Sequence, residues 1–479
     1  MADKIPARLR DWLEKLNAEL DRRTGTINRL DRYHSGDHPP PNHIRRIRAE
    51  TEYEELLKQA VTNWPELIVA SVEQRLAVTG FRFADEKADS DIWDIWQRNS
   101  LDARSGLVHE AALVNGRAYV IVWGDGKLAK ITPEHASTTV VAYATDGVTR
   151  TAALRRWRDG SRWYCTLYLP DGLYKFEGPE QDSVPDKDKW GIRTVSGEAW
   201  PLPNPLRVVP VVEFAVNRSL RPTMFGTGCG EFERVTPIID RINTTIFAGL
   251  LAQAYASFPV RALIGVEPQY ERRVDSAGDP VLDDNDEEIM DPVSPIENLA
   301  VDRLITLEDP DAKLVSLPES NLENYIKAVE SHVRHLAAIT QTPAHYLLGQ
   351  MVNLSADAIR AAEAGLISKV SRHKIDLGEP WEEVMRLALK AQDPSDARAD
   401  QVDGETLWKD SESRSLAEQA DAATKLATVL PQGAVWERVL QASPQEISRW
   451  RSQSAEDGIA ALLQGAGMNG AATSEPIAR

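Results

Sequence analysis

Histidines are the first residues whose spacing could support chemistry. His34, His38 and His43 stand close together around a proline-rich segment, and His332 and His335 are three residues apart in a helical pattern. Clustered imidazoles can hold a transition metal, usually together with cysteine or a further histidine. No cysteine or third histidine stands near the second pair, and solvated or hydrogen-bonded side chains explain the first group. We therefore expect no metal at either place.

Other catalytic patterns are incomplete. His109 begins a stretch like the first half of a zinc-protease motif, but Leu113 stands where the second histidine is needed. The segment LDDNDEE resembles a calcium loop, but Glu288 stands where an EF-hand needs glycine. Neither a phosphate-binding Gly-x-x-x-x-Gly-Lys-Ser/Thr loop nor a Gly-x-Ser-x-Gly nucleophile elbow occurs. We expect a protein that is not an enzyme and that uses no cofactor.

The charge of the chain limits how it can meet nucleic acid. The formal net charge is −18, from 73 acidic and 55 basic residues. Tight non-specific grip on nucleic acid comes from lysine and arginine on phosphates. The composition argues against such a grip over a broad surface. It is compatible with a passage along which DNA slides without adhering, because like charges repel.

Nothing in the sequence favours a membrane or an oxidising compartment. The longest uncharged run, Ile242 to Val260, is interrupted by polar residues such as Asn243 and ends at Pro259. The N-terminal segment reads as a charged amphipathic helix without an apolar signal core. The only cysteines, Cys165 and Cys229, cannot form a disulfide framework and suit a reducing compartment.

The pattern of elements predicts an α+β fold that is mostly helical. Residues 1–100 show helical periodicity, and residues 110–215 alternate in the manner of antiparallel strands with one solvated face. Long helices follow from Glu231 and from about Glu319, separated by an acidic segment with strand patterns. A third long helix begins at Ser355, with a kink expected at Pro380, and short amphipathic helices and a Gly/Ala-rich tail close the chain.

The break before the third long helix is specified on both sides. Pro343 cannot continue the preceding helix, and Gly349 is typical of loops. Ser355 is a favourable N-cap, with Asp357 in the first turn where the helix dipole favours a carboxylate. The pattern predicts an open loop of about a dozen residues.

Several motifs occur in an order that resembles the portal (head–tail connector) proteins of tailed bacteriophages, in the SPP-type family. They are LDRYHSGDHP, then NWPELIVASVEQRLAVTGF, FGTGCGEFERVTPIIDRINTT, ITQTPAHYLLG and SADAIRAAEAGLISKV. Each motif alone is weakly specific, but their order extends over more than three hundred residues.

The resemblance implies how the chain is divided. It implies N-terminal helices and a β-rich wing at 1–230, a first stem helix at 231–257, a small α/β clip at 258–317, a second stem helix at 318–340, a tunnel loop at 341–354, a long kinked helix returning to the wing at 355–411, and a helical crown with a flexible tail at 412–479.

The resemblance also implies two sites. The tunnel loop would project into a DNA channel through uncharged side chains that touch DNA without cationic grip, namely Tyr346, Leu347, Leu348, Gln350, Met351 and Asn353. The clip would dock partner proteins through acidic residues, namely Asp283, Asp284, Asp286, Glu287 and Glu288.

The implied function is that of a phage portal protein: a ring, usually of twelve copies, at one capsid vertex, through which double-stranded DNA is packaged and ejected. The implied partners are the chain itself, the major capsid and scaffold proteins, the large subunit of the terminase, a head–tail adaptor, and double-stranded DNA that passes non-specifically through the channel. The protein would be assembled in the host cytoplasm and reside in the virion, with no membrane partner.

Two alternatives stay open at this point. Another capsid-associated scaffold or minor head protein would also be acidic and helical, but it would lack the order of helix, insertion, helix, loop and helix. A hydrolase using scattered carboxylates would be a monomer or dimer with a deep apolar pocket.

Overall fold

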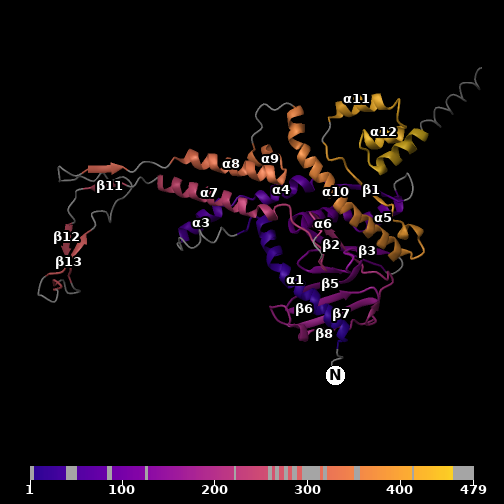
Figure 1. Ribbon diagram of the computed structural model, residues 1–479, viewed down its shortest axis with the longest axis horizontal. Helices are drawn as coiled ribbons and strands as arrows, with labels where there is room; N and C mark the ends of the chain where they lie inside the picture. The colour runs from indigo at the N-terminus through magenta and orange to yellow at the C-terminus, as the bar shows by residue number, and fades with distance from the viewer. Residues whose placement is uncertain are drawn as a thin grey trace, which may run out of the picture. The chain divides into compact units, whose positions relative to one another are not determined.

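The computed structural model describes residues 5–38, 51–83, 89–124, 128–220, 223–256, 261–264, 269–274, 279–282, 288–293, 313–316, 321–349, 356–412 and 415–456 (Figure 1). The chain divides into two compact units. Unit 1 comprises Met1–Pro39, Asn63–Ile239 and Val333–Arg479, and unit 2 comprises Pro40–Thr62 and Asp240–His332. Unit 2 is therefore built from two insertions into the sequence of unit 1. The expected mixture of helix and sheet is confirmed.

A six-stranded antiparallel sheet forms one layer of unit 1, with the order β4-β5-β6-β7-β8 and β9 paired to β7. Its strands are β4 (Thr139–Tyr143), β5 (Arg150–Asp159), β6 (Arg162–Tyr168), β7 (Gly172–Glu180), β8 (Gly191–Ile192) and β9 (Leu202–Pro203). Glycine turn signals set the hairpins: Gly160, in the left-handed region at φ 58°, joins β5 to β6. The antiparallel arrangement expected for residues 110–215 is confirmed.

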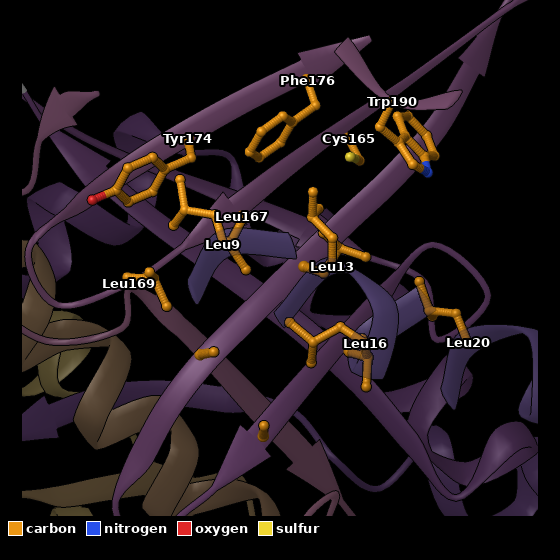
Figure 2. Close-up of a cluster of buried hydrophobic side chains, with 14 residues drawn as sticks. Leu9, Leu13, Leu16, Leu20, Cys165, Leu167, Leu169, Tyr174, Phe176 and Trp190 are labelled. Carbon is orange, nitrogen blue, oxygen red and sulfur yellow. The ribbon is translucent and has the colours of Figure 1, made fainter. Parts of the chain in front are cut away.

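Helix α1 (Ala7–His34) covers one face of this sheet through a stripe of leucines at spacings of four and three. Figure 2 shows Leu9, Leu13, Leu16 and Leu20 directed at strand residues that include Cys165 and Phe176. Burial in this apolar cluster raises the pKa of Cys165. The Cys165 thiol is thus a packing group rather than a reactive one.

A three-stranded antiparallel sheet, β10-β2-β3, forms the second layer. Its strands are β2 (Arg117–Gly124), β3 (Ala129–Glu134) and β10 (Val211–Ala215), and it packs on helix α6 (Leu101–Asn115). The carboxamide of Asn99 bonds the edge strand β3, accepting from the Ile131 N–H at 2.9 Å and donating to the Ala129 carbonyl at 3.0 Å. One side chain here replaces a neighbouring strand, which protects the edge from further pairing.

The expectation that the larger sheet has one solvated face is wrong where the two sheets meet. Val141 and Ala153 belong to a second apolar cluster, which contains Tyr119 of β2, Val211 of β10 and Ile27 from the later part of α1. The smaller sheet therefore covers that face. The alternation in the sequence predicted that the sheet has one apolar and one polar face. It did not show that a second sheet would bury part of the face expected to be solvated.

Both ends of the chain contribute to unit 1. Strand β1 (Val78–Arg82) lies in sequence between helices α4 (Trp64–Glu73) and α5 (Ser90–Arg98). It pairs antiparallel with β15 (Glu405–Trp408), near the other end of the chain. An aromatic cluster lies close by: the Trp381 ring is 4.9 Å from that of Trp96 and 4.6 Å from that of Phe214. Trp381 belongs to α10 (Ala356–Gln392), which continues past Pro380 and packs on β2, β10 and β15.

Unit 2 contains α3 (Thr51–Ala60) and most of two long helices, α7 (Thr236–Ala256) and α8 (Leu322–Thr340), and the boundary between units falls within both. A Cβ on Gly249 of α7 would lie 3.4 Å from the Cβ of Tyr325 of α8, so the glycine permits close helix packing. Two strand pairs lie between these helices in sequence, β11 (Arg261–Ile264) with β14 (Lys313–Ser316) and β12 (Gln269–Arg272) with β13 (Met290–Val293).

Short helices end the described chain. They are α11 (Leu416–Leu426), α12 (Gln432–Arg438) and a helical stretch at 444–456, and single 3-10 turns occur as η1 (Lys187–Lys189), η2 (Glu233–Val235) and η3 (Ala397–Asp400). Ser415 and Glu418 form a capping box at the start of α11. In the residues that the structure describes, no helix is long and apolar enough to cross a membrane.

Candidate functional site

The glycine-rich segment before α7 lies against backbone with no room for side chains. A Cβ on Gly228 would lie 2.2 Å from the carbonyl oxygen of Gly116, and one on Gly230 would lie 2.1 Å from that of Val114. Gly116 itself, at φ 75°, would clash with the nitrogen of Cys229. Each glycine is required because any side chain would force the two backbones apart.

This contact sets where the first long helix begins. Beyond the glycines, the Glu231 N–H donates to the Leu113 carbonyl at 2.8 Å, near the end of α6. η2 and then α7 follow within a few residues. The helix expected from 231 therefore begins with a 3-10 turn, and the segment before it is fixed by a backbone hydrogen bond to α6.

A buried carboxylate holds the strand that leads into the glycine-rich segment. Glu213 of β10 accepts hydrogen bonds from Tyr119 at 3.0 Å, Tyr143 at 2.9 Å and Arg117 at 3.2 Å. Burial disfavours the charged guanidinium, but the carboxylate outweighs it and raises the pKa of Arg117. Burial and the same carboxylate raise the pKa of Tyr143 well above its ordinary value. Both tyrosines therefore stay protonated donors to Glu213.

Two arginines extend this network to the backbone. Arg23 and Arg117 both donate to the carbonyl oxygen of Phe225, at 2.8 and 3.1 Å, and Arg23 also donates to Tyr119 at 3.0 Å. Glu19 compensates the charge of Arg23, with which it pairs one turn earlier in α1. The peptide preceding Gly226 is thus fixed by charged donors, which make stronger hydrogen bonds than neutral ones.

A second ionic cluster, here called the junction, consists of Glu231, Lys369, His373 and Asn217. The Glu231 carboxylate is almost fully buried, 3.0 Å from the Lys369 nitrogen and 2.8 Å from Nε2 of His373, and it accepts a hydrogen bond from Asn217 at 2.8 Å. Burial alone would raise the pKa of Glu231, but His373, Lys369 and Asn217 together lower it to about 2. The carboxylate is therefore charged at neutral pH.

The junction also fixes the end of the second long helix. Lys369 donates to the Thr340 carbonyl at 2.7 Å, which is one of the last carbonyls of α8 without a partner inside the helix. The Thr340 hydroxyl bonds the Leu336 carbonyl at 2.8 Å, and the Thr342 N–H bonds the Ala337 carbonyl at 3.1 Å. Within unit 1, the segment before α7, the end of α8 and the middle of α10 thus meet at the Lys369 side chain, which is 12% exposed.

The segment expected to be an open loop begins with a short helix. The structure has α9 (Ala344–Leu348), which ends at Gly349 in the left-handed region at φ 66°. Leu347 is 5% exposed, and Tyr346 and Leu348 are half-buried. Five residues carry too little periodicity to predict a helix from sequence. Gln350, Met351 and Asn353 lie outside the described residues.

The acidic residues expected to dock partners are mostly outside the structure's described part. Glu288 is exposed, pairs with Arg272 of β12 at 3.1 Å and forms an isolated β-bridge with Leu282. Asp283, Asp284, Asp286 and Glu287 lie outside the described residues. The expectation that these acidic residues form a docking site therefore stays a prediction.

Two of the histidines singled out in the sequence make contacts with neighbouring side chains. His38 stacks on Tyr33 at 4.1 Å, and His34 lies 3.8 Å from Glu110. His43 lies outside the described residues. Among the residues that are described, no three histidine, cysteine or acidic side chains form a cluster that could hold a metal.

His109, from the incomplete zinc-protease pattern, is a core residue. Its Nε2 accepts a hydrogen bond from the Trp381 indole at 2.9 Å, so this nitrogen carries no proton. Complete burial lowers the pKa of His109 to about 3. The residue is a neutral acceptor that connects α6 to α10.

Comparison with known proteins identifies the class. A model of the family "Phage portal protein, SPP1 Gp6-like" matches residues 13–459. The chain belongs to this family, which confirms the resemblance noted in the sequence. Its role is that of a phage portal protein, a structural protein of the virion, and another capsid-associated scaffold or minor head protein is not favoured.

Two curated relatives are named portal proteins. The chain is 30% identical over 438 residues to that of Mycobacterium phage D29, covering 84% of this chain and 81% of the relative. It is 29% identical over 402 residues to the portal protein of Mycobacterium phage L5, covering 79% of this chain and 74% of the relative.

Among solved structures, the fold is similar to chains in the neck of a native gene transfer agent particle, with a TM-score of 0.42 and 11% identity over 81% of this chain and 92% of that one. A chain in the virion of the native gene transfer agent particle has a TM-score of 0.40 and 11% identity, over 82% of this chain and 93% of that one.

Proposed function

We propose that copies of this chain form a ring, usually of twelve, at one vertex of the capsid, and that double-stranded DNA passes through its centre during packaging and ejection. The observation that carries the proposal is the family match over residues 13–459, nearly the whole chain. The net charge of −18 supports it, because an anionic passage does not retain DNA. In this role the protein is a conduit and acts without catalysis.

The parts of the ring follow the division expected from the sequence. Residues 231–257 and 318–340 are the stem, 258–317 the clip and 341–354 the tunnel loop. Residues 1–230 form the N-terminal helices and the β-rich wing, 355–411 the long kinked helix that returns to the wing, and 412–479 the crown with its flexible tail. Support comes from the long helices α7, α8 and α10 in the expected order and from strands β11 to β14 between the first two.

Within the tunnel loop, we propose that DNA is met by uncharged side chains after Tyr346, namely Leu348, Gln350, Met351 and Asn353. Leu347 is buried in its own chain, and the Tyr346 hydroxyl is bound by two partners, so we leave both out of this set. Contact without cations permits movement, because salt-dependent retention of DNA comes from lysine and arginine.

The clip docks the large subunit of the terminase and later a head–tail adaptor, through Asp283, Asp284, Asp286, Glu287 and Glu288. The exposure of Glu288 is the supporting observation. The outer parts of the ring contact the major capsid and scaffold proteins. Assembly takes place in the host cytoplasm, before the protein becomes part of the virion at the portal vertex.

Electron microscopy and mass measurement of the purified full chain test the ring. A closed ring with a central hole and a mass of about twelve subunits is the expected result. A chain that stays monomeric or dimeric at every concentration, and in the presence of scaffold protein, would overturn the proposal. A variant lacking residues 350–354 should form rings but fail to package DNA, and normal packaging by it would remove the proposed role of the loop.

A further inference from the structure

Tyr346 is held on both sides of its hydroxyl group. The hydroxyl donates to a carboxylate oxygen of Glu363 at 2.6 Å and accepts from the Arg75 guanidinium at 2.9 Å. Arg75 and Glu363 lie 3.8 Å apart, and both side chains are only 18% exposed. These three residues are here called the Tyr346 clamp. Arg75 and Glu363 form an ion pair, and the Tyr346 hydroxyl is hydrogen-bonded to both.

The clamp joins three elements of unit 1. Tyr346 belongs to α9, Glu363 to α10, and Arg75 follows α4 (Figure 1). Arg75 is oriented by a hydrogen bond to the Ser71 carbonyl at 3.0 Å, and its guanidinium also lies 5.9 Å from the centre of the Tyr346 ring. The hydroxyl therefore meets a partner that is already positioned.

Helix α9 cannot hold its own place. It has five residues, far below the length at which a helix is stable alone, so contacts outside the helix must fix it. Leu347 supplies an apolar contact and Tyr346 a directional one. Burial, reinforced by the Glu363 acceptor, raises the pKa of Tyr346, so the hydroxyl keeps its proton at neutral pH.

We propose that Tyr346 is a positioning residue of the tunnel loop: its hydroxyl, held between Arg75 and Glu363, fixes α9 and with it Gly349, from which the remaining loop residues continue. The consequence for DNA rests on the proposed function. Tyr346 sets the position of the residues that meet DNA and does not itself meet it. The loop is thereby tied to α4 and α10.

The test uses Tyr346→Phe, which keeps the ring and removes the hydroxyl, in the full chain. The matched control is Tyr164→Phe in β6, because the contacts of Tyr164 with Trp157 and Arg193 are made by its ring, which the change keeps. Hydrogen exchange of the Tyr346 and Gly349 amides is measured, because both are bonded within α9, to the Pro343 and His345 carbonyls. The amide at position 346 remains present in the Phe variant.

We expect Tyr346→Phe to raise exchange of these two amides by roughly tenfold or more, the usual scale for losing a hydrogen bond to a charged group. Tyr164→Phe should leave them unchanged. Adding Glu363→Gln to Tyr346→Phe should raise exchange by less than Glu363→Gln does in the wild-type chain, because the bond that it weakens is already absent. Equal exchange in wild type and Tyr346→Phe, or fully additive effects, would overturn the inference.

Electron microscopy separates the two proposals. Tyr346→Phe should form the same rings as the wild type, while DNA packaging by the variant falls. If the wild type forms no ring, the proposed function fails while the exchange result still decides the clamp. If rings form and exchange rises but packaging is unchanged, α9 is positioned by Tyr346 without consequence for DNA, and the functional part of the inference is wrong.

Discussion

The side-chain nitrogen of Lys369 donates a 2.7 Å hydrogen bond to the carbonyl oxygen of Thr340, the last residue of α8. The same nitrogen lies 3.0 Å from the carboxylate of Glu231, just before α7. A cation at a helix C-terminus is favoured by the helix dipole, and a buried carboxylate requires a cation. One side chain of α10 therefore satisfies groups at the ends of two other helices.

Removing this cation should destabilise the protein strongly. Lys369→Met keeps most of the side-chain volume but leaves Glu231 charged, buried and short of one partner. We expect a loss of about 3–5 kcal/mol in the free energy of unfolding, measured by urea denaturation. Lys327→Met is the control, because Lys327 pairs with Glu323 on an exposed face and should cost less than about 1 kcal/mol. Similar losses in both variants would contradict the role of the junction.

The charge of Glu231 should make stability depend on acid. Its pKa is about 2 in the folded chain against an ordinary value of 4.5, so its contribution is complete above pH 4.5 and is lost as the pH falls towards 2. Glu231→Gln lacks this contribution. The difference in unfolding free energy between wild type and variant, on the order of 3 kcal/mol at pH 7, should shrink between pH 4.5 and 2. A difference that stays constant over that range would be inconsistent with a charged, stabilising Glu231.

His109 should give a pH dependence in a different window. Its pKa falls from an ordinary 6.5 to about 3, so the folded chain favours the neutral ring. That contribution is present above pH 6.5 and is lost as the pH falls from 6.5 towards 3, because the unfolded chain gains the proton first. His109→Leu also leaves the Trp381 N–H without an acceptor, at a cost of about 1–3 kcal/mol. The difference in the free energy of unfolding between the wild type and His109→Leu, measured by urea denaturation, should therefore become smaller as the pH falls from 6.5 to 4.

The glycines before α7 should not tolerate even a methyl group. Gly228→Ala and Gly230→Ala each place a carbon within 2.2 Å of a backbone carbonyl oxygen, so the backbone must move. We expect each to cost about 3 kcal/mol or more, at or beyond the upper end for overpacked sites. Gly25→Ala is the matched control, because nothing lies within 4 Å of its added carbon in the interior of α1. That change should stabilise the protein by about 0.5–1 kcal/mol in the same thermal unfolding assay.

The long elements were predictable from the sequence because their apolar periods are long and uninterrupted. The helices expected at 231–257 and 318–340 correspond to α7 and α8, with starts that differ by a few residues. The proline inside α10 marked an expected kink, and the helix continues through it. Helix α9 was missed because it is short and because one of the residues that hold it, Arg75, comes from a distant part of the chain.

The polar sites depend on pairs that no local pattern shows. Glu213 and Arg117 are separated by 96 residues, and each alone reads as an ordinary surface charge in a strand. Gly228 and Gly230 are visible in the sequence, but the reason that they must be glycine lies in Gly116 and Val114, more than a hundred residues earlier. Tertiary contact, and not local propensity, decides these positions.

The pairing of β1 with β15 has a consequence for biosynthesis. Gly80 meets Leu407, so the partner of β1 emerges from the ribosome more than three hundred residues after it. At roughly 5–20 residues per second, that interval is on the order of half a minute. Throughout this interval the edge of β1 is unpaired, and unit 2, which ends at His332, is completed before the partner strand emerges. A nascent chain halted before residue 405 is thus a species with an open strand edge, for which chaperone binding competes with aggregation.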